Sequence, residues 1–210
     1  MQILIFGAPG VGKGTQAVEL AKKFNLKHIS TGDILRENIQ NNTELGQQVK
    51  SIIEKGELVP DNLIGKIVKD ALIKSEKKFI LDGFPRTRPQ VDILEQVFDE
   101  LKISSPKIII LETDDDVIIK RLTNRRTCNK CGAIVNLLRL DKELTCPKCG
   151  EKNNYSQRDD DTEDVIKNRL KVYHKTTKPA VDYYRAKEGA MILDGTLEPL
   201  EILAIIESKL

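Results

Sequence analysis

The sequence has almost no net charge and no long apolar run. Among its 210 residues, 34 Lys and Arg nearly balance 32 Asp and Glu, which leaves a formal net charge of +2 at pH 7. A chain so close to neutrality has no overall field to draw it onto nucleic acid or an anionic membrane. No apolar segment approaches the roughly 20 residues that a bilayer-spanning helix needs. These absences predict a soluble protein with no membrane partner.

Features of exported or unstructured proteins are also absent. The N-terminus, MQILIFGAPG, has no basic lead and no small-residue cleavage pattern, so it favours a buried strand over a secretory leader. Internal repeats, low-complexity tracts and long Gly/Ser linkers do not occur. With 40% hydrophobic and 31% charged residues, the composition excludes disordered and collagen-like chains. We expect a cytoplasmic protein of one mid-sized domain, or one domain with an inserted lobe.

Short apolar runs alternate with helical patterns along the chain. The runs that predict strands are Ile3–Phe6, Lys27–Ile29, Phe79–Leu81, Lys107–Leu111 and Ala190–Leu193. Between them, apolar residues recur with helical spacing within 17–24, 45–53 and 91–101. Continuously apolar strands separated by helices predict an α/β fold, with a parallel sheet covered by helices on both faces. Such sheets bind ligands beyond the carboxyl ends of their strands.

A glycine-rich segment, GAPGVGKGT at 7–15, follows the first predicted strand and opens a helix. Its glycines let backbone N–H groups converge on a phosphate, and the helix N-terminus adds a positive dipole end. Lys13 is placed to reach the β- and γ-phosphates of a nucleoside triphosphate. Gly14 stands where the general pattern has Ser or Thr, and Thr15 follows, so the usual magnesium-holding hydroxyl is missing or displaced. The alternative interpretation is a glycine-rich turn without a ligand.

Polar clusters follow two more of the predicted strands. Asp33 and Arg36 come after the run at 27–29, while Asp82 and Arg86 come after the run at 79–81, with Gln90 one turn further on. An aspartate at the end of an apolar strand is suited to magnesium or its water shell. The arginines offer forked donors for phosphate. The alternative is that both arginines form surface ion pairs.

All four cysteines lie in one short stretch. Cys128 and Cys131 form one CxxC pair, Cys146 and Cys149 form another, and 14 residues separate the pairs. This spacing predicts a tetrahedral four-thiolate zinc site with no open position for water, and therefore a structural role. Two disulfides, free thiols or iron remain open as alternatives. The two histidines lie away from these pairs in the sequence and are assigned no role.

Residues 124–161 carry these cysteines, show no clear helix and predict a small inserted lobe. Arginines occur at both of its ends, with Arg125 and Arg126 at one and Arg158 at the other. The lobe holds eight Lys or Arg against six Asp or Glu and one aromatic residue, Tyr155. This balance disfavours a nucleic-acid-binding zinc ribbon. Beyond the lobe, Pro179 is expected to divide a helical stretch into two.

Three segments together resemble the adenylate kinase family: Gly7–Gln16 (GAPGVGKGTQ), Ser30–Asp33 (STGD) and Leu81–Thr87 (LDGFPRT). The resemblance extends along the whole chain, and the last segment is specific to the adenylate kinase group of nucleoside monophosphate kinases. The inserted lobe is similar to the long, zinc-bearing form of the family's lid. The resemblance implies a five-stranded P-loop core at 1–29, 60–123 and 162–210, a helical AMP-binding lobe at 30–59 and a zinc-binding lid at 124–161.

The family resemblance also implies a reaction, ATP + AMP = 2 ADP, and a set of site residues. The residues implied to contact AMP are Thr31, Arg36, Glu57, Leu58, Val59, Gly83, Phe84, Pro85, Arg86, Gln90, Arg158 and Arg169. Those implied to contact ATP are Gly10, Val11, Gly12, Lys13, Gly14, Thr15, Arg125, Ile134, Val135 and Leu197. The catalytic set is Lys13, Arg86, Arg121, Arg125, Arg158 and Arg169. Asp33 and Asp82 are implied to hold Mg²⁺ through water, and Gln90 to read the adenine edge.

The expected partners are therefore ATP, AMP and ADP, bound by a monomer with no nucleic-acid or membrane partner. Four alternatives stay open. The first is that the acceptor is UMP, CMP or GMP, and the second is that the donor is GTP, since Leu197 would meet the base only through its main chain. The third is that the P-loop drives a motor or switch attached to a nucleic-acid-binding lobe, and the fourth is that the chain is a structural zinc protein.

Overall fold

A parallel sheet forms the centre of the computed structural model, which describes residues 1–210. Its five strands lie in the order β2-β3-β1-β4-β8, and every neighbouring pair is parallel. The strands are β1 (Gln2–Gly7), β2 (Lys27–Ser30), β3 (Phe79–Asp82), β4 (Lys107–Glu112) and β8 (Met191–Asp194). Each strand end lies within one residue of the end predicted from the apolar runs, so the predicted sheet is confirmed.

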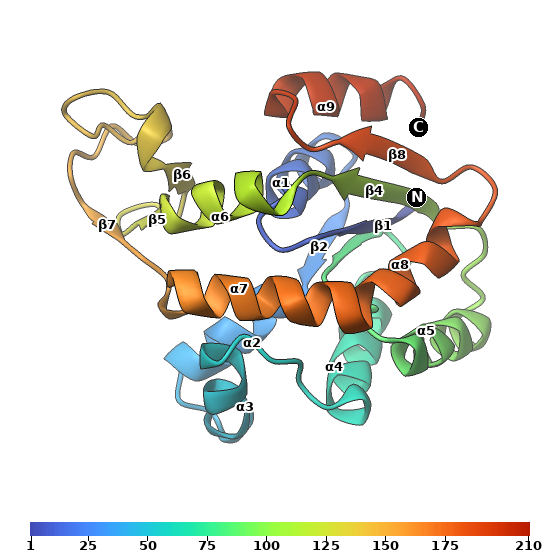
Figure 1. The fold of residues 1–210 in the computed structure, drawn as a ribbon. Coiled ribbons are helices and arrows are strands. Elements are labelled where there is room, and N and C mark those ends of the chain that lie inside the picture. The colour runs from blue at the N-terminus through green and yellow to red at the C-terminus, as the bar shows by residue number, and fades with distance from the viewer.

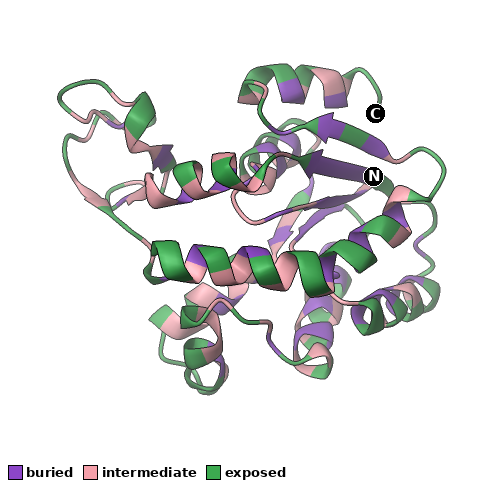
Figure 2. Cartoon of the chain, viewed as in Figure 1, coloured by how far each residue is buried: buried purple, intermediate pink, exposed green.

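Helices cover both faces of this sheet. They are α1 (Lys13–Lys23) and α9 (Pro199–Glu207) on one face, and α4 (Asp61–Ile73), α5 (Arg88–Leu101) and α8 (Lys178–Arg185) on the other (Figure 1). Side chains of β1 alternate between them: Leu4 and Phe6 join the larger buried cluster, while Ile3 and Ile5 join the smaller one. The central strands are therefore buried almost throughout (Figure 2). No helix has both the length and the apolar character needed to cross a bilayer.

Two short helices, α2 (Thr31–Gln40) and α3 (Glu44–Glu54), follow β2 and lie beside the carboxyl edge of the sheet, at the lower left of Figure 1. Each begins at a hydroxyl residue that caps it. The Ser30 Oγ accepts a hydrogen bond from the Asp33 N–H at 3.3 Å, and the Thr43 Oγ1 accepts one from the Gly46 N–H at 3.1 Å. These caps satisfy N–H groups that have no partner within the helix.

A second, smaller sheet interrupts the α/β alternation between α6 (Asp115–Thr123) and α7 (Glu163–Val172). It is antiparallel, in the order β6-β5-β7, with β5 at Arg125–Cys128, β6 at Ile134–Asn136 and β7 at Tyr155–Ser156. The 3₁₀ turns η1 (Leu137–Arg139) and η2 (Asp159–Asp161) complete this segment. Its buried apolar side chains are only Cys128, Val135 and Cys146, so hydrophobic packing contributes little to its stability.

The helical stretch after this sheet is divided, but at a different place from the one predicted. A π-helical turn, η3 at Tyr173–Thr177, separates α7 from α8, and Pro179 lies within the first turn of α8. The Lys178 N–H bonds to the carbonyl of Tyr173, five residues back. Since a proline has no N–H to donate and crowds the preceding turn, the helix widens ahead of Pro179.

Candidate functional site

A cavity of about 450 Å³ opens beyond the carboxyl ends of β1, β2 and β3. Its walls come from the loop after β1, the 30–36 and 56–59 segments, the loop after β3, α7 and the small sheet. Every residue that the sequence predicts to contact a nucleotide or to order magnesium water lines this cavity: Gly10, Val11, Gly12, Lys13, Gly14, Thr15, Thr31, Asp33, Arg36, Glu57, Leu58, Val59, Asp82, Gly83, Phe84, Pro85, Arg86, Gln90, Arg121, Arg125, Ile134, Val135, Arg158, Arg169 and Leu197.

The loop after β1 brings Lys13 to the floor of the cavity. Gly12 precedes α1 with a φ of 116°, a conformation that a side chain at this position would strain. The Lys13 Nζ donates hydrogen bonds to the carbonyls of Gly7 and Ala8, both at 2.9 Å. Burial lowers the pKa of Lys13 to about 8; the Asp82 carboxylate opposes this shift and Arg86 adds to it. The loop therefore holds a largely desolvated ammonium group, which gives up its proton more readily than a surface lysine.

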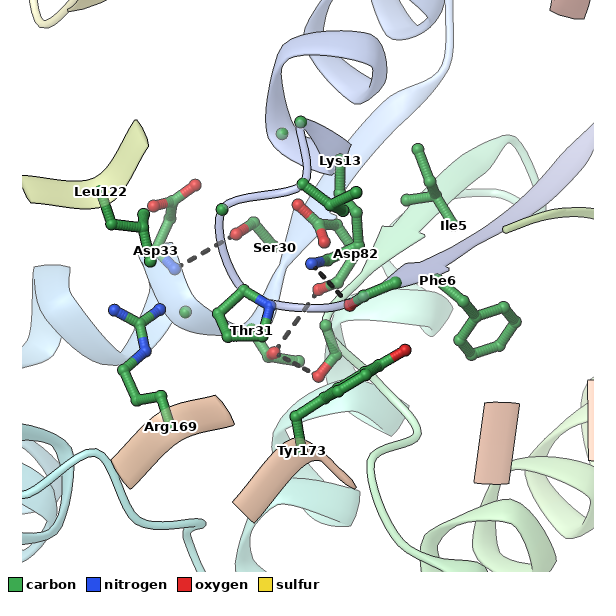
Figure 3. Close-up of a pocket in the computed structure, with 18 of the residues that line it drawn as sticks. Ile5, Phe6, Lys13, Ser30, Thr31, Asp33, Asp82, Leu122, Arg169 and Tyr173 are labelled. Atoms are coloured by element: carbon green, nitrogen blue, oxygen red, sulfur yellow. Dashed lines mark hydrogen bonds between the residues drawn. The ribbon is translucent and has the colours of Figure 1, made fainter. Parts of the chain in front are cut away.

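The ends of β2 and β3 form the second wall. Ser30 and Asp82 lie opposite each other in the parallel register, and the Thr31 hydroxyl donates to the carbonyl of Gly83 at 2.9 Å. Asp82 is 9% exposed and lies beside Lys13 in the view of Figure 3. The Nε2 of His28 is 3.8 Å from an Asp82 carboxylate oxygen, too far for a hydrogen bond. A buried carboxylate thus faces the glycine-rich loop.

Five arginines converge on the same space: Arg36, Arg86, Arg125, Arg158 and Arg169. Burial lowers the pKa of Arg86 and of Arg158 to about 10. The positive charge of Arg169 adds to the lowering at Arg86, and that of Arg36 adds to the lowering at Arg158. These groups stay charged at neutral pH and repel one another. An anion carrying several charges would relieve this repulsion, so the cavity is built to bind one.

Two buried aspartates hold part of this arginine cluster in place. The Arg125 guanidinium donates to both carboxylate oxygens of Asp161, at 2.7 and 2.6 Å. Arg169 pairs with Asp160 at 2.9 Å and with Asp161 at 3.4 Å. Burial opposes ionisation of Asp160, but Arg169 and the other arginines hold its pKa below the usual value. Sequence analysis missed both aspartates, although an acidic run directly after Arg158 was a visible signal.

Asp33 and Arg36 form an ion pair across one turn of α2, with 2.6 Å between Asp33 Oδ1 and Arg36 Nη2. The Arg158 guanidinium lies 4.0 Å from the same oxygen. Burial opposes ionisation of Asp33, yet the hydrogen bond from Arg36 keeps its pKa below the usual value. Asp33 therefore enters the cavity already paired with a cation, unlike Asp82.

Gln90 is 2% exposed, and its amide is held at both ends. Its Oε1 accepts from the Arg86 N–H at 2.7 Å, and its Nε2 donates to Asp61 Oδ1 at 2.7 Å. Asp61, at the start of α4, is a further residue that sequence analysis missed. An aspartate after Pro60 has the appearance of an ordinary helix start, and nothing local to it points to Gln90.

At the rim of the cavity, side-chain contacts connect the segment that carries the small sheet to the loops after β1 and β8. The Arg121 guanidinium donates to the carbonyls of Gly195 at 2.7 Å and Val11 at 3.2 Å. Arg139 forms a two-pronged ion pair with Glu198, at 3.0 and 2.9 Å, directly beside Leu197. Arg126 instead donates to backbone carbonyls at Thr123 and at its neighbour Arg125, so it braces the entry to the small sheet.

The four cysteines meet at the far end of the small sheet. Their sulfur atoms all lie within 4.8 Å of one another, and two of the separations, Cys128–Cys149 and Cys131–Cys146, are 3.7 Å. A disulfide bond would need about 2.05 Å. Four sulfurs about 2.3 Å from a tetrahedral centre lie about 3.8 Å apart, which the observed spacing matches. The donor set thus fits a zinc ion with no open coordination position.

Comparison with known proteins gives one consistent family. A family model described as adenylate kinase matches residues 5–189. A protein of Caldicellulosiruptor bescii named adenylate kinase is 45% identical, across 98% of this chain and 100% of its own length. One of Methanocella arvoryzae with the same name is 44% identical, across 100% of this chain and 98% of its own length. These relatives and this chain therefore match from end to end.

Replacing Asp161 with Asn should destabilise the protein by about 3 kcal/mol, because two buried guanidiniums lose their shared carboxylate. The Asp161 side chain is fully buried and that of Arg125 is 16% exposed, so solvent screens the pair little. Urea unfolding measures the loss. The control is Lys152→Gln, which breaks an exposed ion pair with Glu143 in the 124–161 segment, outside the strands of the small sheet. A loss in Asp161→Asn no larger than in this control would show that the pair contributes nothing.

Proposed function

Since this chain belongs to the adenylate kinase family, we propose that its cavity holds ATP and AMP end to end, with their phosphates meeting at Lys13 and the buried arginines. The chain is a phosphotransferase of the nucleoside monophosphate kinase class, and its reaction is ATP + AMP = 2 ADP. The observation that carries the proposal is that Lys13 and seven arginines line one cavity, whereas only four carboxylates line it, those of Asp33, Glu57, Asp82 and Asp160.

The donor nucleotide occupies the side of the cavity between the glycine-rich loop and the small sheet. Backbone N–H groups of Gly10–Thr15 and the ammonium of Lys13 bind its phosphates. Thr15 is exposed at the start of α1, so its hydroxyl is available to the phosphate oxygens. Ile134, Val135 and Leu197 lie at the rim, where main-chain groups meet the base.

The acceptor occupies the opposite side, below β2 and β3. Arg36 and Arg86 bind the phosphate of AMP, and Thr31, Gly83 and the 57–59 segment enclose its nucleoside. Gln90 presents its amide to the adenine edge. This assignment is supported by the 2% exposure of Gln90 at the base of the cavity and by the depth of Arg86 within it.

Catalysis in this site is positioning together with charge stabilisation. Phosphoryl transfer spreads negative charge over the oxygens of the moving group and requires little covalent participation by the protein. Lys13, Arg86, Arg121, Arg125, Arg158 and Arg169 stabilise this charge without having to reorganise, since the fold has already gathered them. Closure of the 124–161 lid over the phosphates excludes water, which would otherwise act as the acceptor.

Asp33 and Asp82 are the residues that would hold Mg²⁺ through water molecules. The donor set is carboxylate oxygen alone, which suits this ion, and Asp82 is buried beside Lys13 without a hydrogen-bonded cation of its own. Bound together with ATP, the ion neutralises charge on the phosphate oxygens. Asp33 also pairs with Arg36, so the same carboxylate would face both the Mg²⁺ waters and the proposed AMP site.

For the remaining properties, we propose structural zinc at the four cysteines, a monomer, a cytoplasmic location and no nucleic-acid or membrane partner. Zinc is supported by the sulfur spacing and by the thin apolar core of the lid. The lack of a nucleic-acid or membrane partner is supported by the near-neutral charge of +2. The monomeric state and the location rest on the family resemblance, and equilibrium sedimentation tests the former.

Lys13→Met should reduce kcat for ATP plus AMP by at least about a hundredfold, because the buried ammonium and its charge disappear. A coupled assay with AMP, CMP, UMP and GMP measures this loss and the acceptor preference together. Lys22→Met, which changes an exposed lysine on the same helix, serves as the control. Full activity in Lys13→Met, or a preference for another acceptor, would contradict the proposed site.

The value of kcat/KM for ATP should fall as the pH rises above about 8. Lys13 has its pKa lowered to about 8, so it is charged below that pH and loses its proton above it. Because kcat/KM reports groups of the free enzyme, a profile from pH 6 to 10 detects this titration. In Lys13→Arg, any residual activity should keep a flat profile over this range. A flat profile in the parent protein would contradict the assignment.

The protein should contain one zinc ion per chain, and removing it should unfold the lid while leaving the main sheet intact. The reason is that metal binding supplies the folding free energy that a thin core lacks. Metal analysis measures the zinc, and limited proteolysis before and after chelation locates the cleavage sites. Cleavage confined to 124–161 is expected. Disulfides on non-reducing gels, or iron in place of zinc, would contradict the zinc site.

A further inference from the structure

We propose that Asp61 is a positioning residue that locks the direction of the Gln90 amide, and that this lock makes the acceptor site select a 6-amino purine over a 6-oxo purine. This inference rests on the proposed function, in which Gln90 meets the purine edge of the acceptor. Asp61 does not line the cavity, so it acts on the nucleotide only through Gln90.

The lock consists of two contacts at opposite ends of one amide group. At the nitrogen end, Gln90 Nε2 donates to Asp61 Oδ1 at 2.7 Å. At the oxygen end, Gln90 Oε1 accepts from the backbone N–H of Arg86 at 2.7 Å. A carboxylate can only accept, and a backbone N–H can only donate. Rotation of the amide by 180° would therefore set oxygen against carboxylate and NH₂ against N–H.

Thr87 holds the carboxylate itself in position. Its hydroxyl donates to the same Asp61 Oδ1 at 3.1 Å and accepts from the backbone N–H of Gln90 at 3.2 Å. Asp61 begins α4, while Thr87 caps α5 and Gln90 lies in its first turn. Three side chains on two packed helices thus form a closed set of hydrogen bonds around one amide.

After these contacts, the Gln90 amide has one unused hydrogen on Nε2 and one unused lone pair on Oε1. The Watson–Crick edge of adenine offers the matching groups, a 6-amino donor and an N1 acceptor. A 6-oxo purine offers the reverse, a 6-oxo acceptor and an N1–H donor. A 6-oxo purine could pair with a reversed amide. With the locked amide, however, Gln90 Oε1 would face the 6-oxo oxygen, and the Nε2 hydrogen would face the N1–H. Selection against 6-oxo purines therefore depends on preventing the reversal.

The variant Asp61→Asn tests the lock, because it keeps the side-chain shape and lets position 61 either donate or accept. The probe is inosine 5′-monophosphate, which differs from AMP only at the 6-position and N1. We expect the ratio of kcat/KM for AMP to that for inosine monophosphate to fall about tenfold, the size of one mismatched buried hydrogen bond. The KM for ATP should stay within about twofold of the parent value.

The control is Asp70→Asn, which removes the same charge from an exposed position at the other end of α4. It should leave the AMP ratio unchanged. An Asp61→Asn protein in which both acceptors lose kcat/KM in equal proportion, or in which the ratio does not move, would overturn the proposal and leave Asp61 a structural residue. A parent protein that phosphorylates neither nucleotide would refute the proposed function instead.

A measurement on the parent protein decides the question if the variant does not fold. With ¹⁵N-labelled glutamine, the two side-chain N–H protons of Gln90 are observed before and after AMP is added. One proton should show the downfield shift of a hydrogen bond to carboxylate in both states, and the other should shift only with AMP. Two protons that are equivalent and exchange rapidly in the free protein would overturn the lock.

Discussion

Mutual repulsion among half-buried cations is the constraint on which this structure depends. Removing a guanidinium or an ammonium from water costs several kcal/mol unless a carboxylate or hydrogen-bond acceptors compensate. The fold compensates only in part: Asp160 and Asp161 pair with Arg125 and Arg169, Asp33 pairs with Arg36, and backbone carbonyls hold Lys13, whereas Arg86 has no carboxylate partner. The remaining charge can be neutralised by phosphate. The parallel sheet serves this purpose because its carboxyl edge delivers three loops to one place.

The same cations connect the lid to the core. Arg125 begins the small sheet, Asp161 ends the 3₁₀ turn through which the chain leaves it, and Arg169 lies on the helix that follows. The ion pairs among them therefore close the lid segment at its base. A phosphate bound at Arg125, as proposed above, would compete with Asp161 for this guanidinium. It would then alter one of the contacts that close the base of the 124–161 segment.

Much of this arrangement could be predicted from the sequence, because local patterns determine it. Apolar runs located five strands to within one residue, and polar residues after them pointed to the cavity wall. The partners of those residues could not be found in this way. Asp161 and Arg125 are 36 positions apart, and Asp61 and Gln90 are 29 apart. Such pairs meet only through the packing of whole elements.

The two sides of the cavity differ in how deeply their side chains are buried, and this difference affects how each side recognises a ligand. On the acceptor side, Gln90 and Phe84 are 2% and 1% exposed; Gln90 lies in the first turn of α5, and Phe84, in the loop after β3, belongs to the larger buried cluster. On the donor side, Ile134 is 52% exposed, and the Arg139 and Glu198 side chains that bridge the rim are 52% and 69% exposed. Fixed polar groups discriminate between ligands far better than mobile ones. With the nucleotides placed as proposed, the acceptor base would meet buried groups fixed by hydrogen bonds, whereas the donor base would meet exposed groups and the donor would be held chiefly through its phosphate charge.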